Sequence, residues 1–192
     1  MKVLEFQSFL KNINKEIKPN KTPYIIGVAG GSGSGKSFIS SMIQKQFNCV
    51  VLKIDDYYKR KTRINNKDIP QALNLDLVKQ HLIKIHMGQE IIKPVYTFAL
   101  DKDYFETLQP EKIIILDGLF ALNEKFINQL DLKIFLDASE EIRFERRLKR
   151  DMEERGCCKE AIIKRWQETV EPMYQKYVLP QKNKADLIIK NS

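Results

Sequence analysis

The stretch that decides the fold is residues 24–37, YIIGVAGGSGSGKS. Tyr24–Ala29 is a short apolar run of the kind that forms a buried strand. A glycine-rich loop follows it, and the residues from about Lys36 to Phe47 have the composition of a helix. The spacing G-x-x-x-x-G-K-S between a strand and a helix predicts a loop that binds phosphate groups. The alternative is a flexible Gly/Ser turn without a ligand. Such a turn would not require a lysine and a serine directly after the last glycine.

The chemistry of this loop comes from its backbone and from two side chains. Glycines let backbone N–H groups approach phosphate oxygens, and the N-terminus of the following helix adds positive potential. Lys36 is expected to reach the β- and γ-phosphates, and the Ser37 hydroxyl is expected to ligate Mg²⁺. The expected ligands are thus ATP and Mg²⁺, held by Gly30, Gly31, Ser32, Gly33, Ser34, Gly35, Lys36 and Ser37.

Further short apolar runs alternate with segments of helical periodicity. The runs predicted as strands are Val50–Ile54, Ile113–Leu116, Leu132–Leu136 and Leu187–Ile189. The segments predicted as helices are Val3–Ile17, Asn74–Met87, Asn123–Leu130, Ser139–Arg155 and Lys159–Val170. Alternating strands and helices predict a doubly wound parallel sheet, which with the phosphate loop makes an α/β P-loop NTPase fold. The polar, basic stretch Lys59–Ala72 is interpreted as a loop over a site.

Composition narrows the class of protein. A chain of 192 residues fits a single domain, so residues 1–192 are expected to form one unit. Hydrophobic residues make up 43% and charged residues 30%, as in soluble enzymes, and we expect a cytoplasmic protein with no membrane segment. The formal charge of +8 favours anionic partners, either nucleic acid or phosphorylated metabolites. The basic residues form no continuous arm, and charge alone does not decide between these two. Together with the phosphate loop, we expect a small-molecule substrate and no nucleic-acid partner.

Carboxylates follow two of the predicted strands. Asp117 ends the run Ile113–Leu116, where an acidic residue would face the metal, although Asp-Gly pairs are also common turns. Asp55 and Asp56 end the second strand in the same way. A carboxylate at Asp55 could accept the proton of an attacking hydroxyl while also facing the metal. The alternative is that these are solvated turn residues.

The segment 139–155 combines an apolar stripe with a row of arginines. Phe144, Leu148 and Met152 are spaced to pack inward, while Arg143, Arg147 and Arg150 fall on a neighbouring face. A solvated helix with internal ion pairs is one interpretation. Stacked arginines repel each other unless an anion lies nearby, and in a phosphoryl-transfer enzyme that anion is the triphosphate. We therefore predict a helical lid over about residues 139–158.

The tetrapeptide Asn183–Asp186 matches the guanine-binding motif N-K-x-D of GTPases. In GTPases that motif follows a strand, whereas here it precedes the predicted strand Leu187–Ile189. Asp117 is also followed at once by Gly118, so the D-x-x-G switch is missing. A regulatory GTPase is thus disfavoured.

Taken together, these motifs resemble the uridine kinase (uridine–cytidine kinase) family, a relative of phosphoribulokinase. The resemblance spans about Tyr24 to Ile189. The motifs that carry it are GVAGGSGSGKS, Asp55-Asp56-Tyr57-Tyr58 where the family has Asp-Ser-Phe-Tyr, Pro94-Val95-Tyr96-Thr97-Phe98, Asp117-Gly118, Arg146-Arg147-Leu148-Lys149-Arg150-Asp151, and the tail from Val170-Glu171-Pro172 to Ala185-Asp186-Leu187.

The resemblance implies roles for residues on the acceptor side and in the lid. Asp55 would be the base for a 5′-hydroxyl, and Asp68 would bind ribose. The nucleobase contacts would be Tyr96 and Phe98, with Tyr58 nearby. Arg147, Arg150 and Arg155 would be lid arginines, and the adenine pocket would involve Lys182–Asp186. The acceptor-binding excursion would cover about residues 56–105. Members of the family are often tetramers, which implies a homo-oligomer.

The sequence departs from the family pattern on the acceptor side. Asp101 stands where the family has a histidine that hydrogen-bonds the pyrimidine, and Cys157 stands where a lid arginine reaches the nucleoside. The metal-side glutamate of the family is Asp117 here. These departures keep open the same transfer to another ribosyl compound or a sugar phosphate. A second alternative is a P-loop regulatory or RNA-binding NTPase, for which RNA affinity should fall steeply with salt.

Overall fold

The computed structural model describes residue 11 and residues 23–59, 66–96 and 104–191. The predicted helix Val3–Ile17 lies outside the described residues apart from Lys11. Across the described part of the chain, no helix is both long and apolar enough to cross a membrane.

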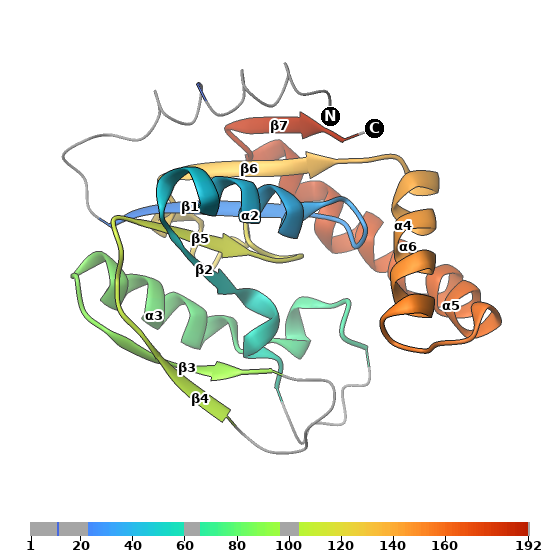
Figure 1. Ribbon diagram of the computed structural model, residues 1–192, viewed down its shortest axis with the longest axis horizontal. Coiled ribbons are helices and arrows are strands. Elements are labelled where there is room, and N and C mark those ends of the chain that lie inside the picture. Colours follow the sequence, from blue (N-terminus) through green and yellow to red (C-terminus); the bar gives the residue numbers. More distant parts are fainter. Residues whose placement is uncertain (1–10, 12–22, 60–65, 97–103, 192) are drawn as a thin grey trace.

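A five-stranded parallel sheet forms the centre of the molecule, in the order β2-β5-β1-β6-β7 (Figure 1). Its strands are β1 (Tyr24–Gly30), β2 (Val50–Lys53), β5 (Ile113–Asp117), β6 (Leu132–Asp137) and β7 (Leu187–Lys190). All five predicted strands are present, each within one residue of its expected ends. Because every strand runs the same way, their carboxyl ends meet at one edge of the sheet.

Two apolar cores lie on opposite faces of this sheet. Along β1, Ile25 faces one core and Ile26 the other, and both are fully buried. Helix α2 (Lys36–Phe47) covers one face, while α3 (Leu75–His86) and the C-terminal helical stretch cover the other. A sheet with helices on both faces confirms the predicted α/β P-loop fold.

The helices begin and end at recognisable caps. The side chain of Asn74 accepts a hydrogen bond from the Leu77 N–H and so caps α3. The side chain of Ser139 does the same for α4 (Glu140–Glu153) at the Ile142 N–H. Both predicted helices are therefore present, each starting one residue after its cap.

The C-terminal helical stretch is longer than the sequence indicated. It begins as α5 (Lys159–Arg165), passes through a π-turn at Trp166–Val170, and continues through α6 (Glu171–Met173). A second π-turn, Tyr174–Val178, and a 3₁₀ segment, Leu179–Lys184, complete it. The expected helix 159–170 is thus the first half of this stretch.

The prediction of a helix over residues 123–130 was wrong. That segment contains only a 3₁₀ turn, Ile127–Gln129. The chain just before it is held by Gln181, whose amide accepts from the Leu122 N–H at 3.0 Å and donates to the Leu119 carbonyl at 2.8 Å. The chain that leads into this segment is therefore held by a side chain from the C-terminal stretch.

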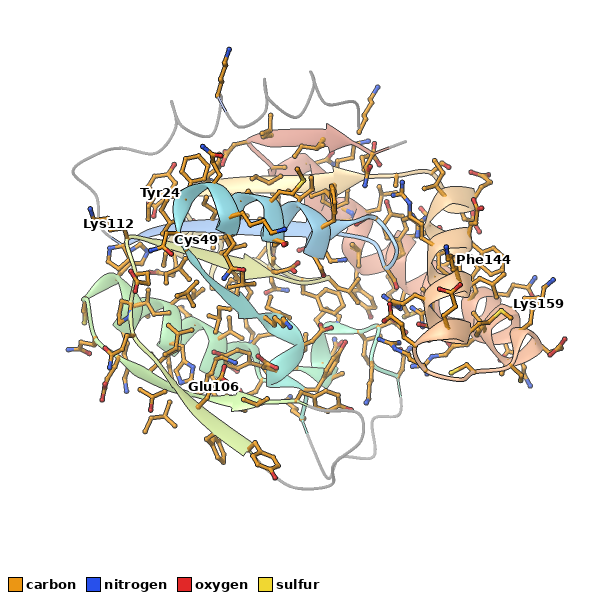
Figure 2. All side chains as sticks on the ribbon, in the orientation of Figure 1. Tyr24, Cys49, Glu106, Lys112, Phe144 and Lys159 are labelled. Atoms are coloured by element: carbon orange, nitrogen blue, oxygen red, sulfur yellow. The ribbon has the colours of Figure 1, made fainter. Side chains whose placement is uncertain are left out.

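An antiparallel hairpin, which the sequence analysis did not predict, lies beside α3 (Figure 1). Its strands are β3 (Ile91–Val95) and β4 (Tyr104–Leu108), with Ile91 opposite Leu108 and Lys93 opposite Glu106. Figure 2 labels Glu106 on the outer strand of this hairpin. The hairpin contacts the 3₁₀ turn Ile54–Tyr57, which connects it to the carboxyl end of β2.

Candidate active site at the carboxyl edge of the sheet

A cleft of about 910 Å³ opens at the carboxyl edge of the sheet, between the phosphate loop and α4. Most of the predicted site residues line it, and they come from the phosphate loop, the strand ends, α4 and the segments that follow β2 and α4. They are Ser32, Gly33, Gly35, Lys36, Ser37, Asp55, Tyr58, Asp68, Asp117, Arg147, Arg150 and Arg155. The structure therefore brings donor-side and acceptor-side candidates into one cavity.

The phosphate loop has the backbone geometry that its glycines predict. Gly33 has φ +80°, and a Cβ at that position would lie 2.2 Å from the Arg143 carbonyl oxygen. Gly35 has φ +91° and forms the N-cap of α2. Lys36 Nζ donates to the Gly31 carbonyl at 2.8 Å, so its ammonium lies across the loop. Only glycine fits at Gly33, because both its backbone angle and the adjacent α4 exclude a side chain.

Asp55 and Asp117 lie at the ends of neighbouring strands. Asp117 is the last residue of β5, opposite Lys53 of β2, and Asp55 follows β2 directly in the 3₁₀ turn. Burial raises the pKa of both carboxyl groups, and the nearby Lys36 ammonium opposes that rise. Burial likewise lowers the pKa of Lys36, against the attraction of Asp117 and Asp55. The three groups thus form one buried electrostatic cluster.

The residues present at this cluster suit a divalent cation with oxygen ligands. Asp117 Oδ1 is buried and has no hydrogen-bond partner among the described residues. Ser37 and Asp117 both line the cleft, so the two candidate ligands face the same space. A hydroxyl and a carboxylate next to a phosphate loop form the kind of donor set that Mg²⁺ takes in such sites. The described residues contain no cluster of three or more His, Cys, Asp or Glu side chains that could hold a metal by themselves.

Helix α4 buries a charged face, and the predicted apolar stripe packs only in part. Arg143, Arg147 and Asp151 are buried, whereas Met152 is 45% exposed. Phe144, labelled in Figure 2, packs edge-on against Trp166 with ring centroids 5.3 Å apart. The inward face is charged because its partners are also polar, and these partners lie in the phosphate loop and the C-terminal stretch.

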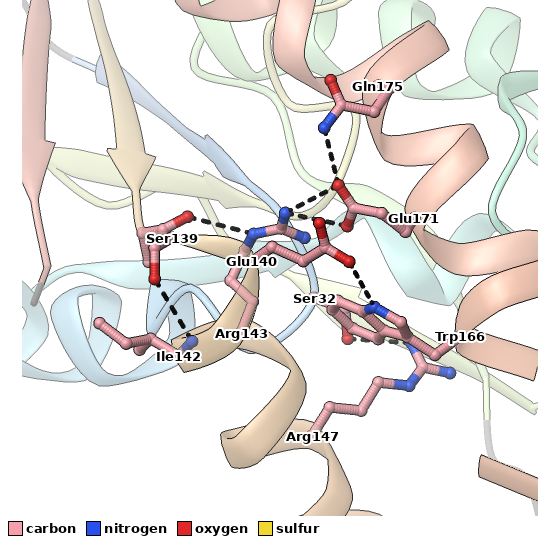
Figure 3. Close-up of polar contacts among 10 residues, drawn as sticks. Ser32, Ser139, Glu140, Ile142, Arg143, Arg147, Trp166, Glu171 and Gln175 are labelled. Atoms are coloured by element: carbon pink, nitrogen blue, oxygen red, sulfur yellow. Dashed lines mark hydrogen bonds and ion pairs between the residues drawn. The ribbon is translucent and has the colours of Figure 1, made fainter. Parts of the chain in front are cut away.

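Asp151 forms ion pairs with three of the arginines that line the cleft. Its carboxylate lies 3.2 Å from Arg147 Nε, 2.8 Å from Arg150 Nη2 and 3.1 Å from Arg155 Nη1. Arg147 in turn donates from Nη1 to Ser32 Oγ at 3.0 Å (Figure 3). A carboxylate on one edge of the guanidinium and the phosphate loop on the other fix the orientation of Arg147. The sequence analysis named Asp151 only as part of the family motif and gave it no role in the site.

Arg143 does not join the arginines in the cleft. It is 2% exposed, pairs with Glu171 through Nη2 at 2.9 Å, and donates from Nε to the Ala138 carbonyl (Figure 3). Its guanidinium also stacks on the Tyr174 ring at 3.7 Å. The expectation that Arg143 shares a phosphate-facing row with Arg147 and Arg150 was therefore wrong, because Glu171 supplies its counter-charge.

The acceptor end of the cleft is aromatic and polar. Tyr58 donates from its hydroxyl to the Lys67 carbonyl at 2.9 Å, and its ring meets that of Tyr96 at a centroid distance of 5.3 Å. Lys67 Nζ donates to the Tyr96 hydroxyl and lies 4.4 Å from that ring's centroid. Asp68 is only 8% exposed, and its Oδ2 has no hydrogen-bond partner within the described ranges. An unpaired buried carboxylate oxygen at a cleft is suited to a hydroxyl donor.

Comparison with known proteins places this cleft in a family. The model of the phosphoribulokinase/uridine kinase family matches residues 25–192. The chain belongs to that family. It is 36% identical over 183 residues to a uridine kinase of Clostridium tetani, covering 88% of each chain. It is 38% identical over 182 residues to a uridine kinase of Halalkalibacterium halodurans, covering 88% of this chain and 86% of that protein. A structure described as a possible uridine kinase from Bacillus stearothermophilus shares the fold, with a TM-score of 0.73 at 15% identity and coverage of 98% and 100%.

The protein is thus an ATP-dependent kinase that phosphorylates a hydroxyl group. Of the kinase's predicted site residues, Gly30, Gly31, Ser34 and Tyr96 do not line the cleft. Gly31 and Ser34 adjoin residues that do, and Tyr96 contacts Tyr58 and Lys67, which line it. Phe98 and Asp101 lie outside the described residues. Lys67, Asp151 and Arg165 line the cleft without having been predicted. For Asp151, the signal was its place in the i, i+4, i+8 series with Arg143 and Arg147.

The N-K-x-D tetrapeptide has a structural place in this kinase. It precedes β7, and Asp186 accepts a hydrogen bond from the Lys133 N–H at 2.8 Å and lies 3.1 Å from Lys133 Nζ. The aspartate therefore fastens β7 to β6 rather than facing a base, which agrees with the expectation that the motif is not a GTPase signature.

Proposed function

We propose that this kinase transfers the γ-phosphoryl group of Mg²⁺–ATP to the 5′-hydroxyl of uridine or cytidine. The observation that carries the proposal is the position of Asp55, which lines one cleft together with Lys36 of the phosphate loop and with Asp68, whose Oδ2 has no hydrogen-bond partner in the described residues. The names of the relatives, uridine kinases at 36% and 38% identity over 88% of the chain, support the choice of acceptor.

In this proposal the triphosphate lies in the loop Gly30–Ser37, against backbone N–H groups and the Lys36 ammonium. Ser37, Asp117 and Asp55 hold Mg²⁺, which neutralises charge on the transferred group. Arg147 and Arg150 face the same phosphates from α4, and Arg155 contacts the nucleotide. No covalent protein intermediate is needed, because positioning and charge stabilisation suffice for phosphoryl transfer.

On the acceptor side, Asp55 takes the proton of the attacking hydroxyl as the oxygen–phosphorus bond forms. The raised pKa of Asp55, caused by burial, makes it a stronger base than an exposed aspartate. Asp68 holds a ribose hydroxyl, and Tyr58, Tyr96 and Phe98 hold the base, with Asp101 in the family's histidine position. Within the predicted lid, residues 139–158, closure of the outer end of α4 over this arrangement would exclude water.

The proposal treats residues 1–192 as one kinase domain, with residues 56–105 as its acceptor-binding part. A homo-oligomer in solution belongs to the same proposal. Transfer to another acceptor remains the alternative outcome, because Cys157 lies in the cleft where the family has an arginine. Asp101→His should then bring no gain with pyrimidine nucleosides.

The test is release of ADP from Mg²⁺–ATP with a panel of acceptors, using Asp55→Ala as the control. The panel contains uridine, cytidine, adenosine, nicotinamide riboside, ribulose 5-phosphate and pantothenate. We expect release with uridine or cytidine that the control loses. Release driven by another acceptor would overturn the assignment to pyrimidine nucleosides. Release independent of any acceptor, together with salt-sensitive RNA binding, would overturn the kinase proposal as a whole.

A further inference from the structure

Asp56 is a buried carboxylate that the proposed reaction does not use. It follows Asp55 in the 3₁₀ turn Ile54–Tyr57, where neighbouring side chains point about 120° apart. Asp55 lines the cleft, whereas Asp56 is 8% exposed and does not. The two adjacent carboxylates therefore serve different surroundings from one rigid turn.

Asp56 has two partners, one within β3 and one at the residue that follows β3. Its Oδ2 lies 2.6 Å from the Lys93 ammonium, and its Oδ1 accepts a hydrogen bond from the Tyr96 N–H at 3.1 Å. Lys93 is 3% exposed and is also paired with Glu106 of β4 at 2.5 Å. Glu106 is largely exposed, so Asp56 is the buried counter-charge of Lys93.

Tyr96 connects this buried pair to the acceptor end of the cleft. Its ring packs edge-on against Tyr58, and its hydroxyl accepts from Lys67. Tyr58 and Lys67 both line the cleft. Asp56 is thus connected to the cleft through its hydrogen bond to the Tyr96 N–H and the contacts of the Tyr96 side chain with Tyr58 and Lys67.

We propose that Asp56 is a positioning residue for the acceptor: its carboxylate fixes Tyr96, and through Tyr96 it fixes Tyr58 and Lys67, relative to Asp55. This inference rests on the proposed function, in which the nucleoside lies beside these residues. Asp55 and the base-contacting surface are then parts of one rigid unit. Their spacing depends on the turn and not on the nucleotide side of the cleft.

A buried ion pair could also serve stability alone, so the test must separate the hydrogen bond from the charges. We compare two double variants, Asp56→Asn with Lys93→Met and Asp56→Leu with Lys93→Met. Both remove the buried charges and keep similar side-chain volumes, and a neutral replacement of a buried pair is often well tolerated. Asparagine can still accept from the Tyr96 N–H, whereas leucine cannot.

We expect the asparagine variant to keep a KM for uridine near the wild-type value. The leucine variant should raise that KM by about tenfold, the effect of one lost buried hydrogen bond, with the KM for ATP changed by less than about twofold. Faster amide hydrogen exchange at Tyr96 in the leucine variant alone would report the lost bond directly. Asp76→Asn, at an exposed pair with Lys125, is the control.

Equal uridine KM values in the two double variants, or equal rises in the KM values for uridine and ATP, would overturn the proposal. A wild-type enzyme that is inactive with uridine and cytidine would instead refute the proposed function. In that case the same pair of variants is compared with the acceptor that the panel identifies. Amide exchange at Tyr96 reads the hydrogen bond independently of any acceptor.

Discussion

Arg147 Nη1 donates a hydrogen bond to Ser32 Oγ at 3.0 Å, which joins the middle of α4 to the phosphate loop across 115 residues of sequence. Asp151 holds the other edge of the same guanidinium. The arginine is thus oriented toward the position of the phosphates before they bind, and charge stabilisation then needs little rearrangement of the protein.

Removal of this guanidinium should therefore act on the chemical step. Arg147→Met is expected to lower kcat by about 10²-fold or more, the usual effect of losing one preorganised donor to a transition state. Lys149→Met, on the exposed side of the same helix, should stay within about twofold of the wild-type enzyme. Steady-state ADP release with saturating ATP and acceptor measures both. An unchanged kcat in Arg147→Met would remove this residue from the catalytic group.

The raised pKa of Asp55 predicts a pH-dependent difference in stability. The ordinary pKa is 3.8, and burial places the folded-state value above it. Between these two values the folded protein binds more protons than the unfolded chain, so this group makes stability fall as pH rises. An asparagine side chain cannot titrate, so Asp55→Asn should gain stability over the wild-type protein as pH rises through this window.

Urea unfolding of both proteins between pH 3 and 8, without Mg²⁺ or nucleotide, measures that difference. The gap should be smallest below pH 3.8 and constant above the folded-state pKa of Asp55. Groups that titrate alike in both proteins cancel in the comparison. Two stability curves that run parallel over the whole range would show that burial does not raise this pKa.

The Arg143–Glu171 pair predicts strong coupling in stability. Arg143→Met should cost about 3–5 kcal/mol, because it leaves the largely buried Glu171 without its counter-charge. Adding Glu171→Met should recover most of that loss, since two apolar side chains replace two charges. A double-mutant cycle from urea unfolding gives the coupling energy. The exposed pair Lys125–Asp76 is the matched control and should couple far more weakly than Arg143–Glu171.

Gly33→Ala should weaken nucleotide binding by more than a positive φ alone explains. Gly33→Ala combines a positive φ with a Cβ 2.2 Å from the Arg143 carbonyl oxygen, so the loop or α4 must move. Gly88→Ala also has a positive φ, +70°, but its Cβ would meet no atom within 4 Å. We expect Gly88→Ala to cost about 1 kcal/mol of stability with ATP binding unchanged. Calorimetric titration should show ATP affinity reduced at least tenfold in Gly33→Ala, and equal affinities in the two variants would contradict this account.

Much of the proposed nucleotide-binding site could be predicted, because its sequence motifs are local. The order of a buried strand, six loop residues and a helix fixes the phosphate loop, and strand ends fix Asp55 and Asp117 at one edge of a parallel sheet. The hairpin was missed because its strand β3 contains Pro94 and the buried Lys93, and neither residue type is common in strand interiors. Lys93 can be buried only because Asp56, distant in the sequence, is its partner.

The burial of Arg143 and Asp151 in α4 was missed for the same physical reason. Helical periodicity favoured Phe144, Leu148 and Met152 as the packing face and placed the arginines on a neighbouring face. The partners that reverse that choice, Glu171 and Tyr174, belong to a helical stretch 28 and 31 residues further along the chain. Periodicity within one helix contains no information about a counter-charge on another.

The anchoring of Arg143 limits how nucleotide can enter and leave. The first turns of α4 are held by the Ala138 carbonyl, by Glu171 and by the Tyr174 ring, and they press on Gly33. Arg150 and Arg155 are about one third exposed. A swing of α4 as a rigid rod would break every one of these anchors, whereas bending or fraying beyond Arg147 would break only the outer arginine contacts. Exchange of ADP for ATP would then be a local event at the outer end of the helix, and the rate of turnover could be tuned there without loosening the phosphate loop.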